Sequence, residues 1–177
     1  CQMNFSDSEK VASILGNCGF LSTRNLEIAD LILINTCSIR EKAEETVRKR
    51  LAQFNSYKSS NPSLLVGVLG CMAERLKSRF LEEEKLVDLV VGPQAYHKLP
   101  ELIARASRKA GERLETEFTA QEKFDALPAR APDGVTAFVS VQEGCDKFCT
   151  FCVVPYTRGA EFSRPIADVL AEARSLA

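Results

Sequence analysis

The sequence predicts an α/β fold in which helices flank an open, mostly parallel sheet. Apolar runs typical of strands buried on both faces alternate with amphipathic segments of helical period. This alternation implies crossover connections, which place neighbouring strands parallel in one sheet. The chain has 177 residues, of which 45% are hydrophobic and 27% charged, as in soluble globular proteins of one or two domains.

Residues 6–18 form the first predicted helix. Ser6 or Asp7 can cap its start, and apolar side chains recur at helical spacing before Gly16. The apolar run over residues 29–35 then predicts a strand that is buried on both faces.

An amphipathic helix follows over residues 39–57, where apolar positions recur among charges and the pattern ends before Asn61-Pro62. A second apolar run, over residues 64–69, predicts the next buried strand. Three more elements complete this unit, and we expect them over residues 73–84 (helix), 86–91 (strand) and 95–106 (helix).

Residues 107–134 lack periodicity and are rich in charge, with interspersed proline and glycine, so we interpret them as an interdomain linker. The first domain then comprises residues 1–106, and residues 135–177 begin a second one. Within the second domain, the alternating pattern over residues 136–142 predicts a strand, and residues 166–176 predict a helix.

One strand and one helix bury too little apolar surface to make a core, so we expect the chain to stop inside its second domain. Because the chain begins at Cys1 rather than at a methionine, we also expect the first strand of the first domain to be missing. A mature lipoprotein also begins with cysteine, but here a predicted helix follows instead of a flexible polar tether.

Charge and cysteine usage narrow the class of protein. The net charge of -1 gives no global basic field for nucleic acid, so a polyanionic partner requires a local patch. No apolar run approaches the roughly 20 residues of a membrane span. Seven cysteines, spaced as for metal binding rather than as in a small disulfide scaffold, indicate a reducing, cytoplasmic environment.

Cys145, Cys149 and Cys152 form a CxxxCxxC run. Three thiolates at this spacing can hold an iron-sulfur cluster and leave one iron open to a ligand. The alternative is core packing, because this spacing would also line one face of a helix. Gly144 before the run and Pro155 after it favour a loop, and therefore a metal site.

A second cysteine set emerges from the predicted topology. Cys37 and Cys71 each follow a predicted strand directly, and Cys1 precedes the first helix. Since the carboxyl ends of parallel strands share one edge of the sheet, these three thiols could meet and hold a second cluster. Each of them could instead be a small residue in a tight turn. Cys18 lies at a helix end and does not share the pattern.

Six spaced segments carry a family resemblance: Cys1-Gln2-Met3-Asn4, Asp7-Ser8-Glu9, Asn35-Thr36-Cys37-Ser38-Ile39-Arg40-Glu41, Gly70-Cys71-Met72-Ala73-Glu74, the stretch from Gly144 to Gly159, and Ser163-Arg164-Pro165. Together they resemble the methylthiotransferases of the radical S-adenosylmethionine (SAM) superfamily, most closely the MiaB type. The resemblance covers nearly the whole chain. It implies that residues 135–177 begin a radical SAM partial (β/α) barrel and that residues 1–106 are the methylthiotransferase amino-terminal domain.

The resemblance also implies a function, which is the addition of a methylthio group to C2 of N6-isopentenyladenosine at position 37 of tRNA. The implied cofactors are SAM and two 4Fe-4S clusters, and the implied partners are that tRNA and an electron donor such as a flavodoxin-like protein. No membrane partner is implied. Two cysteine sets match the family's ligands, namely Cys145, Cys149 and Cys152 for the SAM-binding cluster and Cys1, Cys37 and Cys71 for the auxiliary cluster.

The resemblance suggests weaker roles for other residues. Phe151 matches an aromatic position near the SAM adenine, and packing within the protein is the equal alternative. Arg158 and Arg164 could bind the SAM carboxylate or a phosphate, and ordinary ion pairs are the alternative. Asn4 and Asn35 are expected to hydrogen-bond the turns that carry Cys1 and Cys37.

Three alternatives remain open at this point. A methylthiotransferase that acts on a ribosomal protein usually reads Cys-Pro-Lys-Asn where this chain has Cys1-Gln2-Met3-Asn4. A methylthiotransferase that acts on threonylcarbamoyladenosine in tRNA shares the same cysteine layout. Outside the enzymes, the chain could be a noncatalytic iron-sulfur or zinc module, and we expect a fragment of this length to be inactive on its own.

Overall fold

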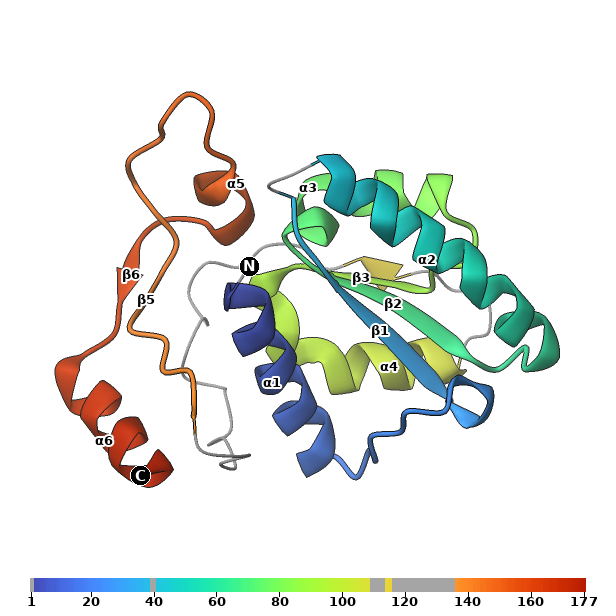
Figure 1. The fold of residues 1–177 in the computed structure, drawn as a ribbon, viewed down its shortest axis with the longest axis horizontal. Helices are drawn as coiled ribbons and strands as arrows, with labels where there is room; N and C mark the ends of the chain where they lie inside the picture. Colours follow the sequence, from blue (N-terminus) through green and yellow to red (C-terminus); the bar gives the residue numbers. More distant parts are fainter. Residues whose placement is uncertain (1, 39–40, 109–113, 116–135) are drawn as a thin grey trace.

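The computed structural model describes residues 2–38, 41–108, 114–115 and 136–177. Helices cover both faces of a parallel sheet, and a smaller unit lies beyond one edge (Figure 1). The first elements are α1 (Gln2–Asn17), η1 (Leu26–Ile28), β1 (Leu31–Thr36), α2 (Glu41–Ser60), β2 (Leu65–Gly70), α3 (Cys71–Glu83) and β3 (Leu89–Val91). The later ones are η2 (Pro93–Lys98), α4 (Leu99–Arg108), β4 (Leu114–Glu115), β5 (Gln142–Glu143), α5 (Val154–Arg158), β6 (Phe162–Ser163) and α6 (Ile166–Leu176).

The main sheet has the strand order β1-β2-β3-β4, and every pair is parallel. The predicted α/β class and open parallel sheet are therefore confirmed. β4 adds two residues to the edge of the sheet beside β3, inside the stretch that the sequence predicts as a linker. Among the described residues, no helix has the length and apolar character needed to cross a membrane.

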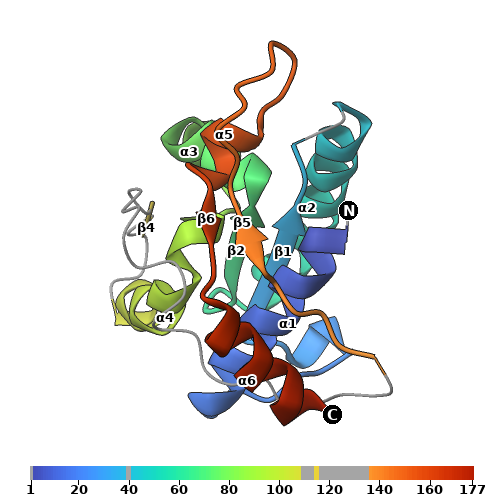
Figure 2. The same ribbon diagram turned by 90° about the vertical axis from the view of Figure 1, so that its left-hand side faces the viewer.

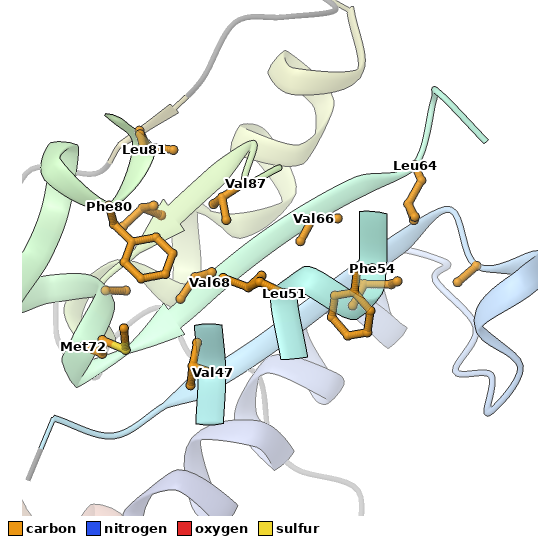
Figure 3. Close-up of a cluster of buried hydrophobic side chains, with 14 residues drawn as sticks. Val47, Leu51, Phe54, Leu64, Val66, Val68, Met72, Phe80, Leu81 and Val87 are labelled. Atoms are coloured by element: carbon orange, nitrogen blue, oxygen red, sulfur yellow. The ribbon is translucent and has the colours of Figure 1, made fainter. Parts of the chain in front are cut away.

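The two faces of β2 build two separate cores, because successive side chains of a strand point to opposite faces. Val66 and Val68 face α2 and α3, where they join the cluster drawn in Figure 3. Leu65 and Leu69 face α1 and α4 and contribute to the second cluster. This burial on both faces explains why the strand reads as a continuous apolar run.

The covering helices bury narrow apolar stripes. In α2, Val47, Leu51 and Phe54 recur at the i, i+4, i+7 spacing that lines one helix face, and all three are buried. In α4, Leu99 and Ile103 belong to a similar stripe against the opposite face of the sheet. The charged residues of both helices lie mostly on the outside, as the predicted amphipathic patterns require.

The second unit differs from its predicted form. The strand expected over residues 136–142 is wrong in extent, because only β5 forms, and it pairs antiparallel with the equally short β6. An alternating pattern cannot make a strand without a ladder partner, and β6 supplies only two residues. The helix expected over residues 166–176 is confirmed as α6. The short helix α5 was not predicted, and Pro155 lies in its first turn, where proline is tolerated.

Leu51→Ala should destabilise the fold by about 2–5 kcal/mol, because Leu51 is only 1% exposed at the centre of the first core. The matched control is Leu21→Ala, since Leu21 is 94% exposed and should change the free energy of unfolding by less than about 0.5 kcal/mol. Urea unfolding followed by circular dichroism measures both. Equal midpoints for the two variants would contradict the assigned core.

Candidate metal centre

Cys37 and Cys71 leave the sheet from neighbouring strand ends. β1 ends at Thr36 and β2 at Gly70, and these two residues are register partners in the parallel pair. The cysteine that follows each of them therefore lies at the same carboxyl edge, with Cys37 partly buried and Cys71 buried. Cys1, the third residue of this predicted set, lies outside the described residues.

Gly70 allows the two strand ends to approach closely. Its backbone has φ +94°, and a Cβ added there would lie 2.4 Å from the carbonyl oxygen of Thr36 and 2.6 Å from Oδ1 of Asn35. The Thr36 hydroxyl also donates a hydrogen bond of 2.5 Å to the carbonyl of Leu69. Position 70, immediately before Cys71, therefore requires glycine, because its φ is positive and because a side chain would collide with Thr36 and Asn35.

Polar side chains tie this edge to three helices. Arg75 of α3 donates from Nε to the hydroxyl of Ser38 at 2.6 Å and pairs with Glu44 of α2, which holds Ser38, the residue after Cys37, between these two helices. On the other side, Nδ2 of Asn35 donates to the carbonyl of Asn4 at 2.8 Å. The first turn of α1 is thus held at the same edge as the two cysteines.

Three buried polar atoms at this edge have no hydrogen-bond partner among the described residues. They are Oδ1 of Asn35, Oε1 of Gln94 and the hydroxyl of Tyr96, and the last two belong to η2, which follows β3. Burial, followed by the negative charge of Asp7, raises the pKa of Tyr96 well above its usual value, so its hydroxyl stays protonated. Buried polar atoms normally find partners, and of these three only the Tyr96 hydroxyl can donate a hydrogen bond.

The second cysteine set lies on the cysteine loop, residues 144–153, which contains neither helix nor strand, as predicted. Its stem is closed by hydrogen bonds. The Cys145 N–H donates to the Gly159 carbonyl at 3.1 Å, and the Glu161 N–H donates to Oδ1 of Asp146 at 2.9 Å. Gly144, at φ +76°, packs so tightly that an added Cβ would lie 2.0 Å from a backbone oxygen.

The tip of the loop is open to solvent. Cys149 is exposed, Cys145 and Cys152 are partly buried, and the Cys152 N–H donates to the Cys149 carbonyl at 2.9 Å. Phe151 is 92% exposed, and Phe148 makes an edge-to-face contact with a neighbouring tyrosine. In the part of the chain that is described, no three His, Cys, Asp or Glu side chains converge closely enough to hold a metal.

Two buried ion pairs connect the loop's flanks to α1. Arg158 donates to both carboxylate oxygens of Asp7, at 2.6 and 3.3 Å, and Lys10 pairs with Glu143 at 2.8 Å. All four side chains are buried. Burial alone would lower the pKa of Arg158, but the hydrogen bonds and charge of Asp7 raise it above the usual range. Arg158 is therefore used structurally here, and its contact with SAM stays a prediction.

Sequence reasoning missed these pairs. It treated Asp7 as a possible helix cap, although α1 begins earlier, at Gln2. A signal was available, because Asp7 and Lys10 share a helix face with the apolar Val11 and Ile14. Charges on a buried helix face need partners from elsewhere in the fold.

The donor set fits iron-sulfur chemistry. Thiolates are the usual ligands of these clusters, and the described cysteines are all free. At the sheet edge, Cys37 and Cys71 follow adjacent strand ends that are register partners. On the cysteine loop, the number and spacing of the thiols fit, although their sulfurs are not gathered around one point.

The fold and site define a class of α/β domain with cysteines at the carboxyl ends of its strands. Residues 1–92, more than half of the chain, match the model of Uncharacterized protein family UPF0004, and the chain belongs to this family.

Curated relatives agree with the resemblance to methylthiotransferases. The tRNA-2-methylthio-N(6)-dimethylallyladenosine synthase of Christiangramia forsetii is 58% identical over 179 residues, covering 100% of this chain and 37% of the relative. The proteins of the same name from Flavobacterium johnsoniae and Ruegeria pomeroyi are 56% and 53% identical; each covers 99% of this chain, and 37% and 40% of the relative. The chain thus spans about two fifths of the length of these relatives.

Gly70→Ala should destabilise the protein by about 1–3 kcal/mol, because alanine is strained at this positive φ and its Cβ collides with Thr36. The control is Gly16→Ala in α1, where an added Cβ meets nothing within 4 Å and should stabilise by up to about 1 kcal/mol. Urea unfolding gives both values, and the rate of Cys71 alkylation reports the local change. An unaltered midpoint and alkylation rate in the Gly70 variant would refute the close approach.

Proposed function

We propose that this chain is the amino-terminal part of a tRNA methylthiotransferase that modifies C2 of N6-isopentenyladenosine at position 37 of tRNA. The observation that carries the proposal is identity of 51–58% to tRNA-2-methylthio-N(6)-dimethylallyladenosine synthases over essentially the whole chain. This similarity extends through both cysteine sets. Its partners would be that tRNA, SAM and a reducing protein of the flavodoxin kind, in the cytoplasm.

The proposed ligands are the two predicted cysteine sets, Cys1, Cys37 and Cys71 for the auxiliary 4Fe-4S cluster and Cys145, Cys149 and Cys152 for the SAM-binding one. When bound, the cluster held by Cys145, Cys149 and Cys152 would supply the electron for reductive SAM cleavage, and the cluster held by Cys1, Cys37 and Cys71 would supply sulfur. Such chemistry is required because C2 of adenine carries an unactivated C–H bond, which acid-base groups cannot replace with sulfur.

The residues of this chain would position and shield these groups. The close contact at Gly70 and the hydrogen bond from Asn35 to α1 would fix the thiols at the sheet edge. On the cysteine loop, a closed stem and an open tip would let SAM approach the thiols from solvent. The exposed ring of Phe151 is free to stack on the SAM adenine, in support of its predicted role.

We assign residues 1–106 to the methylthiotransferase amino-terminal domain and residues 135–177 to the radical SAM domain, with residues 107–134 between them. The contents of the first part support this division, since it holds the two apolar cores. The second part holds the cysteine loop, and α6 has no buried residue.

Anaerobic reconstitution with iron and sulfide should load about eight irons per chain, four for each 4Fe-4S centre. Replacing Cys1, Cys37 and Cys71 together by Ala should leave about four, and so should replacing Cys145, Cys149 and Cys152. The matched control is Cys18→Ala, which removes an exposed cysteine outside both sets and should keep the full complement. Iron analysis with Mössbauer spectroscopy distinguishes these outcomes, and a parent that holds only zinc or about four irons would exclude two clusters.

The substrate is tested with the full-length protein, SAM, a reductant and tRNA isolated from a strain that lacks the modification. Mass spectrometry of the digested tRNA should show methylthiolation of isopentenyladenosine, and the Cys18→Ala control should retain it. Each triple cysteine variant should lose it. Modification of a ribosomal protein alone, or of threonylcarbamoyladenosine alone, would assign the chain to another branch.

A further inference from the structure

The cysteine loop carries one buried charge on each of its flanks. Glu143 lies just before the loop and Arg158 at the end of α5 just after it. Each binds a residue of opposite charge on α1, at 2.8 Å for Lys10 and 2.6 Å for Asp7. The signs are crossed, because the helix supplies one acid and one base and the loop flanks supply their complements.

We propose that these two crossed ion pairs position the cysteine loop over the sheet edge that carries Cys37 and Cys71. The four charged residues are positioning residues, because each side chain is paired with its partner on the other unit and acts through the loop. The proposal rests on the proposed function only where it treats the two cysteine sets as two centres whose separation matters.

Because the signs are crossed, the flanks of the cysteine loop can bind α1 in one register, and other registers bring like charges together. Asp7 and Lys10 are three residues apart in α1 and therefore lie one turn apart on the same face. If the loop slid along the helix by that turn, Glu143 would approach Asp7 or Arg158 would approach Lys10. Like charges in a buried interface are strongly unfavourable, so the arrangement selects one register even if it adds little net stability.

A further hydrogen bond holds the Arg158 flank to η2, the 3-10 helix that follows β3. Nε2 of Gln94, in η2 after β3, donates to the carbonyl of Arg158 at 2.5 Å. Arg158 is therefore held by its side chain to α1 and by its backbone to η2. α5 also packs on α3, the helix that begins with Cys71. Figure 2 shows the β5–β6 stem in front of the main domain, with α5 beside α3.

Reversing the charges of Lys10 and Glu143 tests the positioning of the cysteine loop without any metal. The full chain is prepared metal-free and reduced, and hydrogen–deuterium exchange is followed in peptides that cover residues 142–164. Lys10→Glu and Glu143→Lys should each accelerate exchange in these peptides by about tenfold, because each places like charges together. The double variant should return the exchange towards that of the parent, while peptides of β2 stay unchanged in all three.

Lys85→Glu is the matched control, because it makes the same charge change at an exposed turn and should leave loop exchange unaltered. If a reversed variant fails to fold, Lys10→Gln and Glu143→Gln remove one charge with little change in volume and should still accelerate exchange. The proposal is overturned if the single variants exchange like the parent, or if the double variant is no better than the worse single one.

A second measurement uses the iron-loaded protein. Pulsed electron paramagnetic resonance of the reduced centres should give one narrow distance in the parent and the double variant, and a broadened one in each single variant. Iron content should stay unchanged in all of them. An unbroadened distance in the single variants would overturn the positioning role. Failure to load two centres would instead count against the proposed function, and the exchange result would stand independently.

Discussion

The register between β1 and β2 is the constraint on which the site depends. Because Thr36 pairs with Gly70, the two residues that follow, Cys37 and Cys71, leave the sheet at one place. If one strand shifted by one residue, its side chains would turn to the opposite faces of the sheet, so the two cores maintain the register. The fold's stability and the placement of its thiols therefore have the same origin, the burial of side chains on both faces of β2.

The helix α1 links the two halves of the molecule. Its first turn is bonded to Asn35 at the end of β1, its apolar side packs on the sheet, and its two buried charges meet the flanks of the cysteine loop. Charged groups are rarely buried in proteins unless they are paired, so Asp7 and Lys10 require oppositely charged partners from the distant cysteine-loop region. The contact between α1 and the cysteine-loop flanks is therefore determined by paired charges, whereas the cores on the two faces of the sheet are determined by the packing of apolar side chains.

Much of the first unit follows from its sequence, because continuous apolar runs and helical stripes record burial directly. The edge shared by Cys37 and Cys71 follows too, since parallel topology alone brings strand ends together. The partners of Asp7 and Arg158 do not, because a single sequence does not state which distant charges meet. The shortness of β5 could not be predicted from the sequence either, because the length of a strand depends on the strand that pairs with it, and β6 has only two residues.

The crossed charges also limit which second units from related proteins can be joined to this first unit. A second unit transplanted from a related chain would dock on this α1 only if it brought an acid before its cysteine loop and a base after it. With the order inverted, both contacts would become repulsive, even if every cysteine and apolar residue were retained. The two units can therefore be exchanged between related proteins only when these four side chains, none of which belongs to a thiol set, match in charge.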